Sequence, residues 1–489
     1  MTLRDLAEAV KQGVREAGGI PLEFPTISLG EELMKPTAML YRNLMAMEIE
    51  ENLRSYPVDG VILLCNCDKT VPAQLMGAAS ANLPAIQLNG GPKDAGVWQG
   101  KRLGSGTDLW KLWDNVRGGS LPQASFHEIE KQLSCGPGAC NVMGTASTMN
   151  AISEALGMMP AGFSSMSVGS SERTAGAREA GVRIVGMVGE NLRPSDVMTQ
   201  EAFDNAICVL LALGGSTNAI IHLLAIAGRL GVDLTLDRFD TLSRNIPCIA
   251  DVQPAGKHLI DEFHEAGGVP AVMNRISNFL NLGSITLSGQ PGTEVLSRFS
   301  VQDETVIRLI DSAVAVPPTL AVLRGNLAPS GAVLKVAAAS SRLLKHSGPA
   351  LVFDNYEDML TRIDDPDLDV TAETVLVLRN AGPRGACGMP EWGMLPIPKK
   401  LQAAGVRDMV RMSDARMSGT SFGTVVLHIA PEAAVGGASR AGTDGRSHHT
   451  RRRGTRGFAG SHHRRTGAPR QILDPTRHRP SARISETLP

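Results

Sequence analysis

The spacing of apolar residues at the start of the chain predicts an amphipathic helix. Leu3, Leu6, Val10 and Val14 recur three or four positions apart, as on one face of a helix. The series stops at Gly18-Gly19, and glycine is a common signal for a helix C-terminus. We therefore expect the chain to begin with a helix that packs one side against a core.

Helical and strand-like patterns then alternate up to about residue 320. The predicted elements are an extended segment at 20–29, a helix at 39–55, a strand in "VDGVILL" (58–64), a helix at 70–82 and a strand in "LPAIQL" (83–88). This alternation predicts an α/β domain over residues 1–320, with a largely parallel sheet covered by helices on both faces. Ligands bind beyond the carboxyl ends of such strands, which is where "CNCDK" (65–69) follows the first run.

From about residue 321 the pattern changes to short β-rich pieces separated by Gly and Pro turns. These pieces are "GPALVFD", "ETVLVLRNAGPRG", "DMVRMSDARMSG" and "GTVVLHIA". Several short strands with turn signals between them are typical of an all-β domain. We expect a second, smaller, β-barrel-like domain over residues 321–436.

The charge distribution separates residues 437–489 from the rest of the chain. The net charge of −1 conceals an end segment, 440–489, with 12 Arg, no Lys and three acids, hence +9, which leaves −10 for residues 1–439. This tail has hardly any apolar periodicity, so disorder and a nucleic-acid-binding arm are two interpretations. A third interpretation, which we favour, is a change of coding frame near Gly437, where the residue pattern typical of a folded domain ends.

The cysteines and the absence of targeting patterns bear on the compartment. Seven cysteines, an odd number without the spacing of a disulfide framework, indicate a reducing environment and predict a cytoplasmic protein. The first residues lack a basic region followed by an apolar one, and no stretch offers about 18 uncharged apolar residues in a row. We expect no membrane segment.

A set of motifs, in order along the chain, identifies a resemblance to a known family. They are "ISLGE", "CDKTVPAQLMGAAS", "NGGP", "SCGPGACNVMGTASTMNAISEALG", "LGGSTNAIIHLLAIA", "NLAPSGAVLK", "GPRGACGMPE" and "SDARMSGTSFGT". With these motifs the sequence resembles the iron-sulfur dehydratases of dihydroxy acids and sugar acids, from residue 3 to about 436. The resemblance implies a hydro-lyase that converts a 2,3-dihydroxy acid into a 2-keto-3-deoxy acid.

Two further stretches bear on the substrate. "GKRLGSGTDLWKLWDNVRGG" and "MPEWGMLPIPKKL" look like the sugar-acid branch, which includes arabinonate and xylonate dehydratases. The alternative is a dihydroxy-acid dehydratase of branched-chain amino-acid synthesis. The resemblance also implies a homodimer or homotetramer, a small sugar acid as the partner, and no membrane or nucleic acid.

The resemblance implies two metal groups, and their chemistry explains the mixture of residues in "CNCDK". Removal of water needs one group that stabilises the enolate and another that acts as a Lewis acid on the departing hydroxyl. Mg²⁺ prefers oxygen ligands, whereas iron-sulfur clusters prefer thiolates. By position in the motifs, the residues that match Mg²⁺ ligands are Glu31, Asp68, Lys69 as a carbamate, and Glu391, and those that match ligands of a [2Fe-2S] cluster are Cys67 and Cys140.

The resemblance also assigns a base and a substrate loop. Ser418 in "ARMSG" matches the serine that removes the C2 proton, and Asn89, Gly90, Gly91 and Pro92 look like a loop against the substrate. Taken alone, a serine in such a stretch would indicate only a turn. Its place within a family motif favours the catalytic interpretation.

The remaining cysteines and one histidine have no such support. We interpret Cys208, Cys248 and Cys387 as packing residues, and His222 in an apolar helical stretch as structural. The resemblance places a third cluster cysteine upstream of the helix at Leu3, and no cysteine here precedes Cys65. Cys65 and Cys135 are therefore possible substitutes, and an inactive, truncated relative remains an alternative to an active dehydratase. Nucleic-acid binding through the tail is the alternative from another class.

Overall fold

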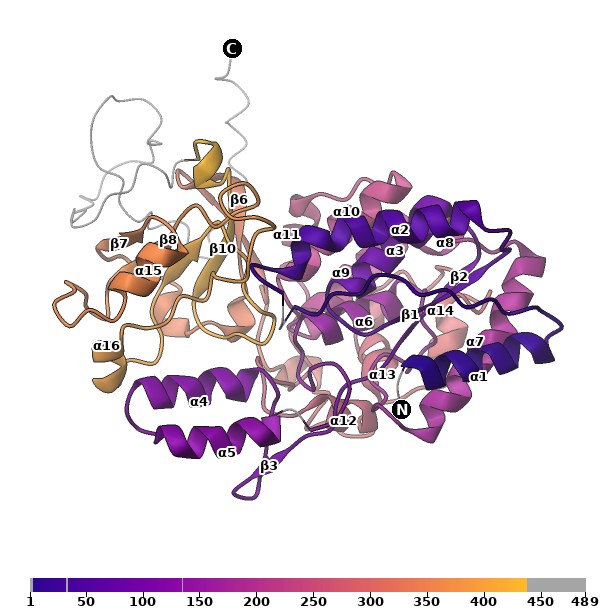
Figure 1. Cartoon of the computed structure of the whole chain (residues 1–489), viewed down its shortest axis with the longest axis horizontal. Helices are drawn as coiled ribbons and strands as arrows, with labels where there is room; N and C mark the ends of the chain where they lie inside the picture. Colours follow the sequence, from indigo (N-terminus) through magenta and orange to yellow (C-terminus); the bar gives the residue numbers. More distant parts are fainter. Residues whose placement is uncertain (1–2, 32–33, 134, 438–489) are drawn as a thin grey trace, which may run out of the picture.

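The computed structural model describes residues 3–31, 34–133 and 135–437, so the Arg-rich tail lies outside the described residues apart from Gly437. A helical N-terminal part and a smaller C-terminal part built on a sheet lie side by side (Figure 1). Within the described residues, no helix has the length and apolarity needed to cross a membrane.

The N-terminal part is built mainly of helices. They are α1 (Leu3–Glu16), α2 (Arg42–Ser55), α3 (Thr70–Ala81), α4 (Thr107–Arg117), α5 (Gln123–Leu133), α6 (Thr145–Ala155), α7 (Ser171–Glu190), α8 (Pro194–Val197), α9 (Gln200–Ala212), α10 (Asn218–Leu230), α11 (Leu236–Ser243), α12 (Ile260–Glu265), α13 (Gly268–Arg275) and α14 (Gly292–Leu296). Its strands are β1 (Val61–Cys65), β2 (Ala85–Asn89), β3 (Val97–Trp98) and β4 (Lys101–Arg102). The predicted elements α1, α2, β1, α3 and β2 are thus confirmed.

The predicted parallel sheet is smaller than expected. β1 and β2 pair in parallel, with Val61 opposite Ala85 and Cys65 opposite Asn89, but the described residues add no third strand to this pair. The parallel pairing that we expected is thus present, but among the described residues it involves these two strands alone. After β2 the chain continues mainly as helices.

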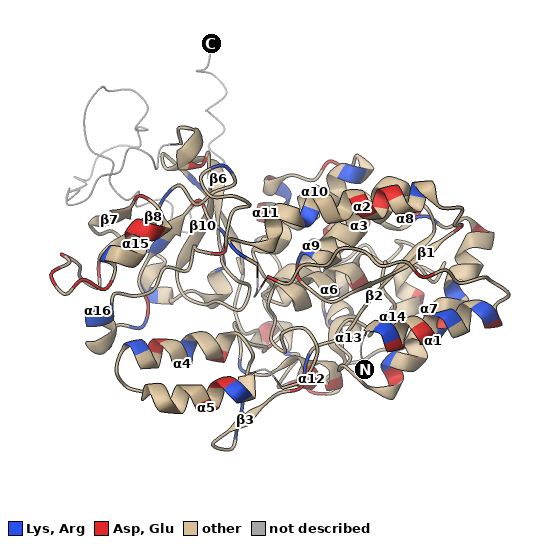
Figure 2. Ribbon diagram, viewed as in Figure 1, with Lys and Arg blue, Asp and Glu red and all other residues tan. Residues whose placement is uncertain are grey.

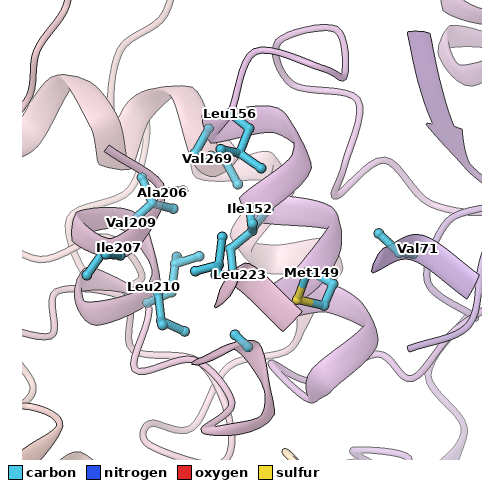
Figure 3. Close-up of a cluster of buried hydrophobic side chains, with 14 of the residues drawn as sticks. Val71, Met149, Ile152, Leu156, Ala206, Ile207, Val209, Leu210, Leu223 and Val269 are labelled. Atoms are coloured by element: carbon cyan, nitrogen blue, oxygen red, sulfur yellow. The ribbon is translucent and has the colours of Figure 1, made fainter. Parts of the chain in front are cut away.

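Helix α6 lies at the centre of the main hydrophobic core. Its residues Met149 and Ile152, together with Leu156 just after its end, face side chains of α9, α10 and α13 (Figure 3). Every residue of α6 except Ala146 is buried. This core fixes α3, α6 and α10, and the loops at the ends of these helices carry many of the predicted site residues.

Glycine allows α1 to pack closely on α7. A Cβ on Gly13 would lie 1.9 Å from the carbonyl oxygen of Arg178, and a Cβ on Gly181 would lie 2.2 Å from that of Val10. An ion pair of 2.7 Å between Arg178 and Glu16 joins the same helices at the surface. Acidic and basic residues alternate along such outer helices rather than forming a single basic face (Figure 2).

The C-terminal part contains a mixed six-stranded sheet. Its strands are β5 (Ala321–Gly325), β6 (Ala328–Leu334), β7 (Ala350–Phe353), β8 (Val375–Leu378), β9 (Arg411–Ser413) and β10 (Val425–Ala430), and its helices are α15 (Tyr356–Arg362) and α16 (Lys399–Ala403). The order is β5-β6-β10-β9-β8-β7, with antiparallel pairs on the β5 side and parallel pairs from β10 to β7. In the described residues the strands thus form a row ending in β5 and β7, which replaces the barrel-like form we expected. The four predicted β-rich pieces each contain a strand, β7, β8, β9 and β10, whereas β5 and β6 were not predicted.

Helices α4 and α5 lie below the C-terminal part in Figure 1. Although α4 belongs to the N-terminal half of the sequence, its Arg117 forms an ion pair of 2.7 Å with Asp364 and donates a hydrogen bond of 3.1 Å to the carbonyl of Ile397. This helix therefore ties the N-terminal part to the C-terminal sheet.

The buried carboxyl of Glu154, on α6, is expected to make the stability of the core depend on pH. Burial raises the pKa of this carboxyl from 4.5 to about 7, although the backbone amides of Gly162 and Ser164 donate to it. The folded state therefore holds one more proton than the unfolded state between these values, so the free energy of unfolding falls as pH rises through this window. The effect of this one group is on the order of 3 kcal/mol.

We expect Glu154→Gln to remove this slope, because the glutamine does not titrate. Urea unfolding of both proteins between pH 4.5 and 8 measures the difference. Glu179→Gln, which changes an exposed carboxyl on α7, should preserve the slope. An identical pH dependence for the parent and Glu154→Gln would contradict the prediction.

Candidate active site

Three carboxylates from distant segments surround one buried lysine. Lys69 lies between β1 and α3 and is fully buried. Its Nζ contacts the carboxylate of the adjacent Asp68, lies 3.4 Å from Oε2 of Glu31, and lies 3.6 Å from Oε1 of Glu391. The structure therefore brings together all four residues that the resemblance assigned to Mg²⁺.

A second buried cation, which the sequence analysis missed, completes this cluster. Arg416 is fully buried, and its guanidinium lies 2.9 Å from Glu391 and 3.8 Å from Glu31. Its Nε donates to the carbonyl of Met389. The available signal was its position in "SDARMSG", two residues before Ser418.

Neutral side chains orient two of the carboxylates. The hydroxyl of Thr37 donates to Glu31 at 2.6 Å, and the amide of Ala38 donates to the other carboxylate oxygen at 2.9 Å. The side-chain amide of Asn218, at the start of α10, donates to Glu391 at 2.7 Å. Asn218 and Thr37 were also missed, because nothing local in their motifs indicates which carboxylate they meet.

The charges in this cluster shift one another's pKa values. Burial raises the pKa of Asp68, but the neighbouring Lys69 ammonium outweighs burial and leaves that pKa below its ordinary value. Burial lowers the pKa of Lys69, and Asp68 reverses this effect, so the amine is held protonated. For Glu391 burial is the stronger effect, and its pKa is raised despite Lys69 and Arg416. Three carboxylates and two cations form a nearly balanced group.

The donor chemistry of this cluster fits Mg²⁺, a hard cation that takes carboxylate oxygens as ligands. As placed, the carboxylates point to Lys69 and Arg416 rather than to one shared point. Accordingly, no three His, Cys, Asp or Glu side chains in the described segments are arranged so that they could hold a metal ion. The fit rests on the kind and charge of the side chains gathered here.

The two predicted cluster cysteines lie on loops that are joined to each other. Cys67 is half-buried, and its thiol donates to Asp68 at 3.3 Å, so it adjoins the carboxylate cluster. Cys140, also half-buried, follows Ala139, whose amide donates to the carbonyl of Gly91 at 2.8 Å. With its amide oriented to suit its neighbours, Asn66 bridges Gly91 and Ala139 at 3.2 Å to each. Accessible thiols on adjoining loops suit a shared iron-sulfur group.

The predicted substrate loop, Asn89 to Pro92, leads from the end of β2 to the Cys140 loop. Pro92 pairs with Ala139 in an isolated bridge, and Gly91 has a positive φ of 93°. The side chain of Asn89 is fully buried, where it accepts from Arg173 and donates to the carbonyl of Ser164. Contact between this loop and a substrate stays a prediction.

Ser418 lies on the loop between β9 and β10, two residues after Arg416. Its hydroxyl is 3.0 Å from the hydroxyl of Thr420 and is only partly buried. The next residue, Gly419, packs against Thr145 so tightly that a Cβ would lie 2.5 Å from its amide nitrogen. Thr145 in turn accepts from Asn218, the residue that holds Glu391. The predicted base is thus connected to the carboxylate cluster through Gly419, Thr145 and Asn218.

The other cysteines separate into buried and accessible ones. Cys208 and Cys248 are buried, and burial raises the pKa of each thiol to about 12, which agrees with a packing role. Cys65 is likewise buried in the main core, and burial raises its pKa well above the ordinary range, so the thiolate needed of a ligand is disfavoured. Cys387 is exposed, so the packing interpretation of this residue is wrong. It lies in a turn after Gly385, on the loop that leads to Glu391.

Cys135 and His222 complete the predicted residues. Cys135 is half-buried, and its thiol donates to the carbonyl of Gln132 at 3.1 Å. His222 is fully buried, and burial together with Arg42, 3.1 Å from its Nδ1, lowers its pKa well below the ordinary value. This environment agrees with the structural role that we expected for His222.

Carboxylates, thiols and a serine from both parts of the chain thus lie near one another, which is the set of groups that a hydro-lyase needs. Two family models cover nearly all of the described chain: the dihydroxy-acid/6-phosphogluconate dehydratase N-terminal model matches residues 1–295, and the corresponding C-terminal model matches residues 305–445. The chain belongs to this family of hydro-lyases. Membership implies an iron-sulfur cluster and Mg²⁺, and it confirms the resemblance drawn from the motifs.

Several named proteins are similar to this chain. It is 50% identical to a 6-deoxy-6-sulfo-D-gluconate dehydratase of Pseudomonas putida over 438 residues, which cover 89% of this chain and 76% of the relative. It is 49% identical to an L-arabinonate dehydratase of Rhizobium leguminosarum, with the same coverage. A dihydroxy-acid dehydratase of Methanothermobacter thermautotrophicus is 39% identical over 91% of this chain and 81% of the relative. These sugar-acid dehydratases are thus more similar to the chain than this dihydroxy-acid dehydratase.

The charge balance around Lys69 can be tested by substitution. Lys69→Met would leave Asp68, Glu31 and Glu391 buried with one cation, and breaking a buried ion pair typically costs 3–5 kcal/mol. We expect the free energy of unfolding of the metal-free protein to fall by roughly 3 kcal/mol, as measured by urea unfolding in the presence of a chelator.

A second buried lysine supplies the matched control. Lys335 is also buried, its Nζ has no hydrogen-bond partner within the described residues, and burial lowers its pKa to about 8. Lys335→Met should therefore leave stability unchanged or raise it, because it removes an uncompensated polar group. Equal losses for both variants would show that Lys69 does not balance the carboxylates.

Proposed function

We propose that the protein dehydrates a 2,3-dihydroxy sugar acid to a 2-keto-3-deoxy acid. The observation that carries this proposal is the convergence of Glu31, Asp68, Lys69 and Glu391 beside the thiol of Cys67. The higher identity to relatives named as sugar-acid dehydratases supports the sugar-acid class over a branched-chain dihydroxy acid. Assays with a panel of sugar acids would identify the particular substrate.

The residues divide the work between two groups. Glu31, Asp68, Glu391 and a carbamate on Lys69 would hold Mg²⁺, and Cys67 with Cys140 would hold a [2Fe-2S] cluster. When bound, Mg²⁺ supplies positive charge for the substrate carboxylate and 2-hydroxyl, and the cluster supplies a Lewis acid for the 3-hydroxyl.

The chain's own residues carry the proton and place the substrate. Ser418, as its alkoxide, takes the proton from C2, and the electron pair of that bond forms the C2–C3 double bond while hydroxide leaves C3. Hydroxide becomes water by taking from Ser418 the proton that came from C2, which restores the alkoxide, and the enol becomes the 2-keto-3-deoxy acid by moving its hydroxyl proton to C3. The loop from Asn89 to Pro92 borders the carbon chain of the substrate.

The neighbouring carboxylates affect whether the amine of Lys69 is protonated or carbamylated. Its raised pKa opposes carbamylation, which needs the neutral amine, and a carbamate would place a fourth negative charge beside Asp68, Glu31 and Glu391. We therefore expect carbamylation of Lys69 to depend on Mg²⁺, because the cation would offset the repulsion among these negative charges.

The same proposal includes a division into two domains and an oligomeric state. A division into residues 1–320 and 321–436 places Glu31, Asp68, Lys69, Cys67 and Cys140 in the first unit and Glu391 with Ser418 in the second. Catalysis then requires both units. We also propose assembly as a homodimer or homotetramer.

Purified anaerobically with iron, sulfide and Mg²⁺, the protein should form keto acid from L-arabinonate or a related sugar acid. The measurement is the semicarbazide assay for 2-keto acids over a panel that includes a branched-chain 2,3-dihydroxy acid. Turnover of that compound alone would favour the dihydroxy-acid alternative. Ser418→Ala should lower kcat at least a hundredfold with unchanged iron content, since it removes the base and no ligand.

Lys69→Arg should also be severely impaired, although the positive charge is kept. Guanidinium is not readily carbamylated and has no lone pair to offer a cation. Mg²⁺ affinity by isothermal titration calorimetry should fall at least tenfold, and kcat should fall with it. An active Lys69→Arg protein would show that the lysine acts as a cation.

A further inference from the structure

The hydroxyl of Ser418 is bound by one neighbour through two groups. The hydroxyl of Thr420 lies 3.0 Å away, and the backbone amide of Thr420 donates to Ser418 Oγ at 3.4 Å. The described contacts of the predicted base are therefore determined by where Thr420 lies.

The side chain of Thr420 is confined between two glycines. A Cβ on Gly106 would lie 2.6 Å from Thr420 Cβ, and a Cβ on Gly144 would lie 2.8 Å from its Cγ2. The Thr420 carbonyl also accepts from the hydroxyl of Thr107 at 3.0 Å. Packing and this bond fix Thr420 against the start of α4.

Helix α4 supplies one further contact, from Trp110. Its indole Nε1 donates to Thr420 Oγ1 at 3.1 Å. An indole N–H is a donor only, so Thr420 Oγ1 must accept this bond, and its own hydrogen is left to donate to Ser418. Hydrogen bonds in such a chain strengthen one another, so the indole makes Thr420 a better donor.

Catalysis by Ser418 as a base requires Thr420 to be the donor of the hydrogen bond between their side chains. The reason is that a serine that has lost its proton can only accept hydrogen bonds. If the Thr420 hydroxyl were turned away, the amide at 3.4 Å would be the one donor from Thr420 to Ser418. The indole bond favours the productive orientation before a substrate arrives.

We propose that Trp110 is a positioning residue that acts through Thr420 to hold the side-chain oxygen of Ser418 in place, so that its deprotonated form can accept the C2 proton. The proposal rests on the proposed function in one respect, the role of Ser418 as the base. The far end of α4 is anchored by the ion pair between Arg117 and Asp364, which keeps Trp110 in register with the loop of Ser418.

Trp110→Phe keeps an aromatic ring and removes only the donor, and Trp113→Phe is its matched control. Both tryptophans lie on α4 and are partly exposed, at 37% and 39%, but Trp113 packs against Phe126 at 5.3 Å between ring centroids. We expect Trp110→Phe to lower kcat about tenfold, the equivalent of one hydrogen bond, with KM within twofold of the parent. Trp113→Phe should retain both values. A loss confined to KM, or an equal loss in both variants, would overturn the proposal.

A second measurement needs no turnover. The chain has four tryptophans, so labelling with ¹⁵N-tryptophan gives a resolvable set of indole N–H signals, and Trp110→Phe assigns one of them. Thr420→Val should shift the Trp110 signal by removing its acceptor, and Thr420→Ser should restore it. Ser418→Ala should also shift it, while the signal of Trp113 stays in place.

The two measurements separate the proposal from the function on which it rests. A Trp110 signal that ignores both Ser418→Ala and Thr420→Val would overturn the positioning role, whatever the parent turns over. If that signal responds to both while the parent dehydrates no sugar acid, the positioning of Ser418 is supported and the proposed function is overturned.

Discussion

Lys69 and Arg416 bring two positive charges into a part of the molecule that excludes water, and the active site depends on how these charges are balanced. Burying either cation alone would be costly, since a charge in a medium of low dielectric must be paired and hydrogen-bonded. Glu31, Asp68 and Glu391 supply the opposite charge. Because these carboxylates come from distant segments, the balance also fixes how the two parts of the chain meet.

The same constraint explains the neutral residues around the cluster. With three carboxylates and two cations, the remaining carboxylate oxygens need donors, which Thr37, the amide of Ala38 and Asn218 provide. Such donors set the direction of each carboxylate without adding charge.

Much of this could be predicted from the sequence. The helices and strands around "CNCDK" follow from local periodicity, and Asp68, Lys69, Glu31 and Glu391 follow from motifs, which record position in a family. Arg416, Asn218 and Thr37 could not be assigned roles in this way, because each acts on a carboxylate far away in the chain. The number of strands in the parallel sheet could not be predicted in the same way, because an apolar run such as that in α9 suits a buried strand and a buried helix equally. Cys387 shows that a small, soft residue can be exposed where a turn presents it.

The wide separation of the site residues in the chain affects the order of events during synthesis. Glu31, Asp68 and Lys69 leave the ribosome early, whereas Glu391 and Arg416 follow after on the order of half a minute at bacterial elongation rates. Throughout that interval the nascent lysine has only its two early carboxylate partners, and the charged cluster is incomplete. The full charge balance therefore belongs to the finished polypeptide, and a ribosome that stalls before residue 391 yields a product that lacks both Glu391 and Arg416.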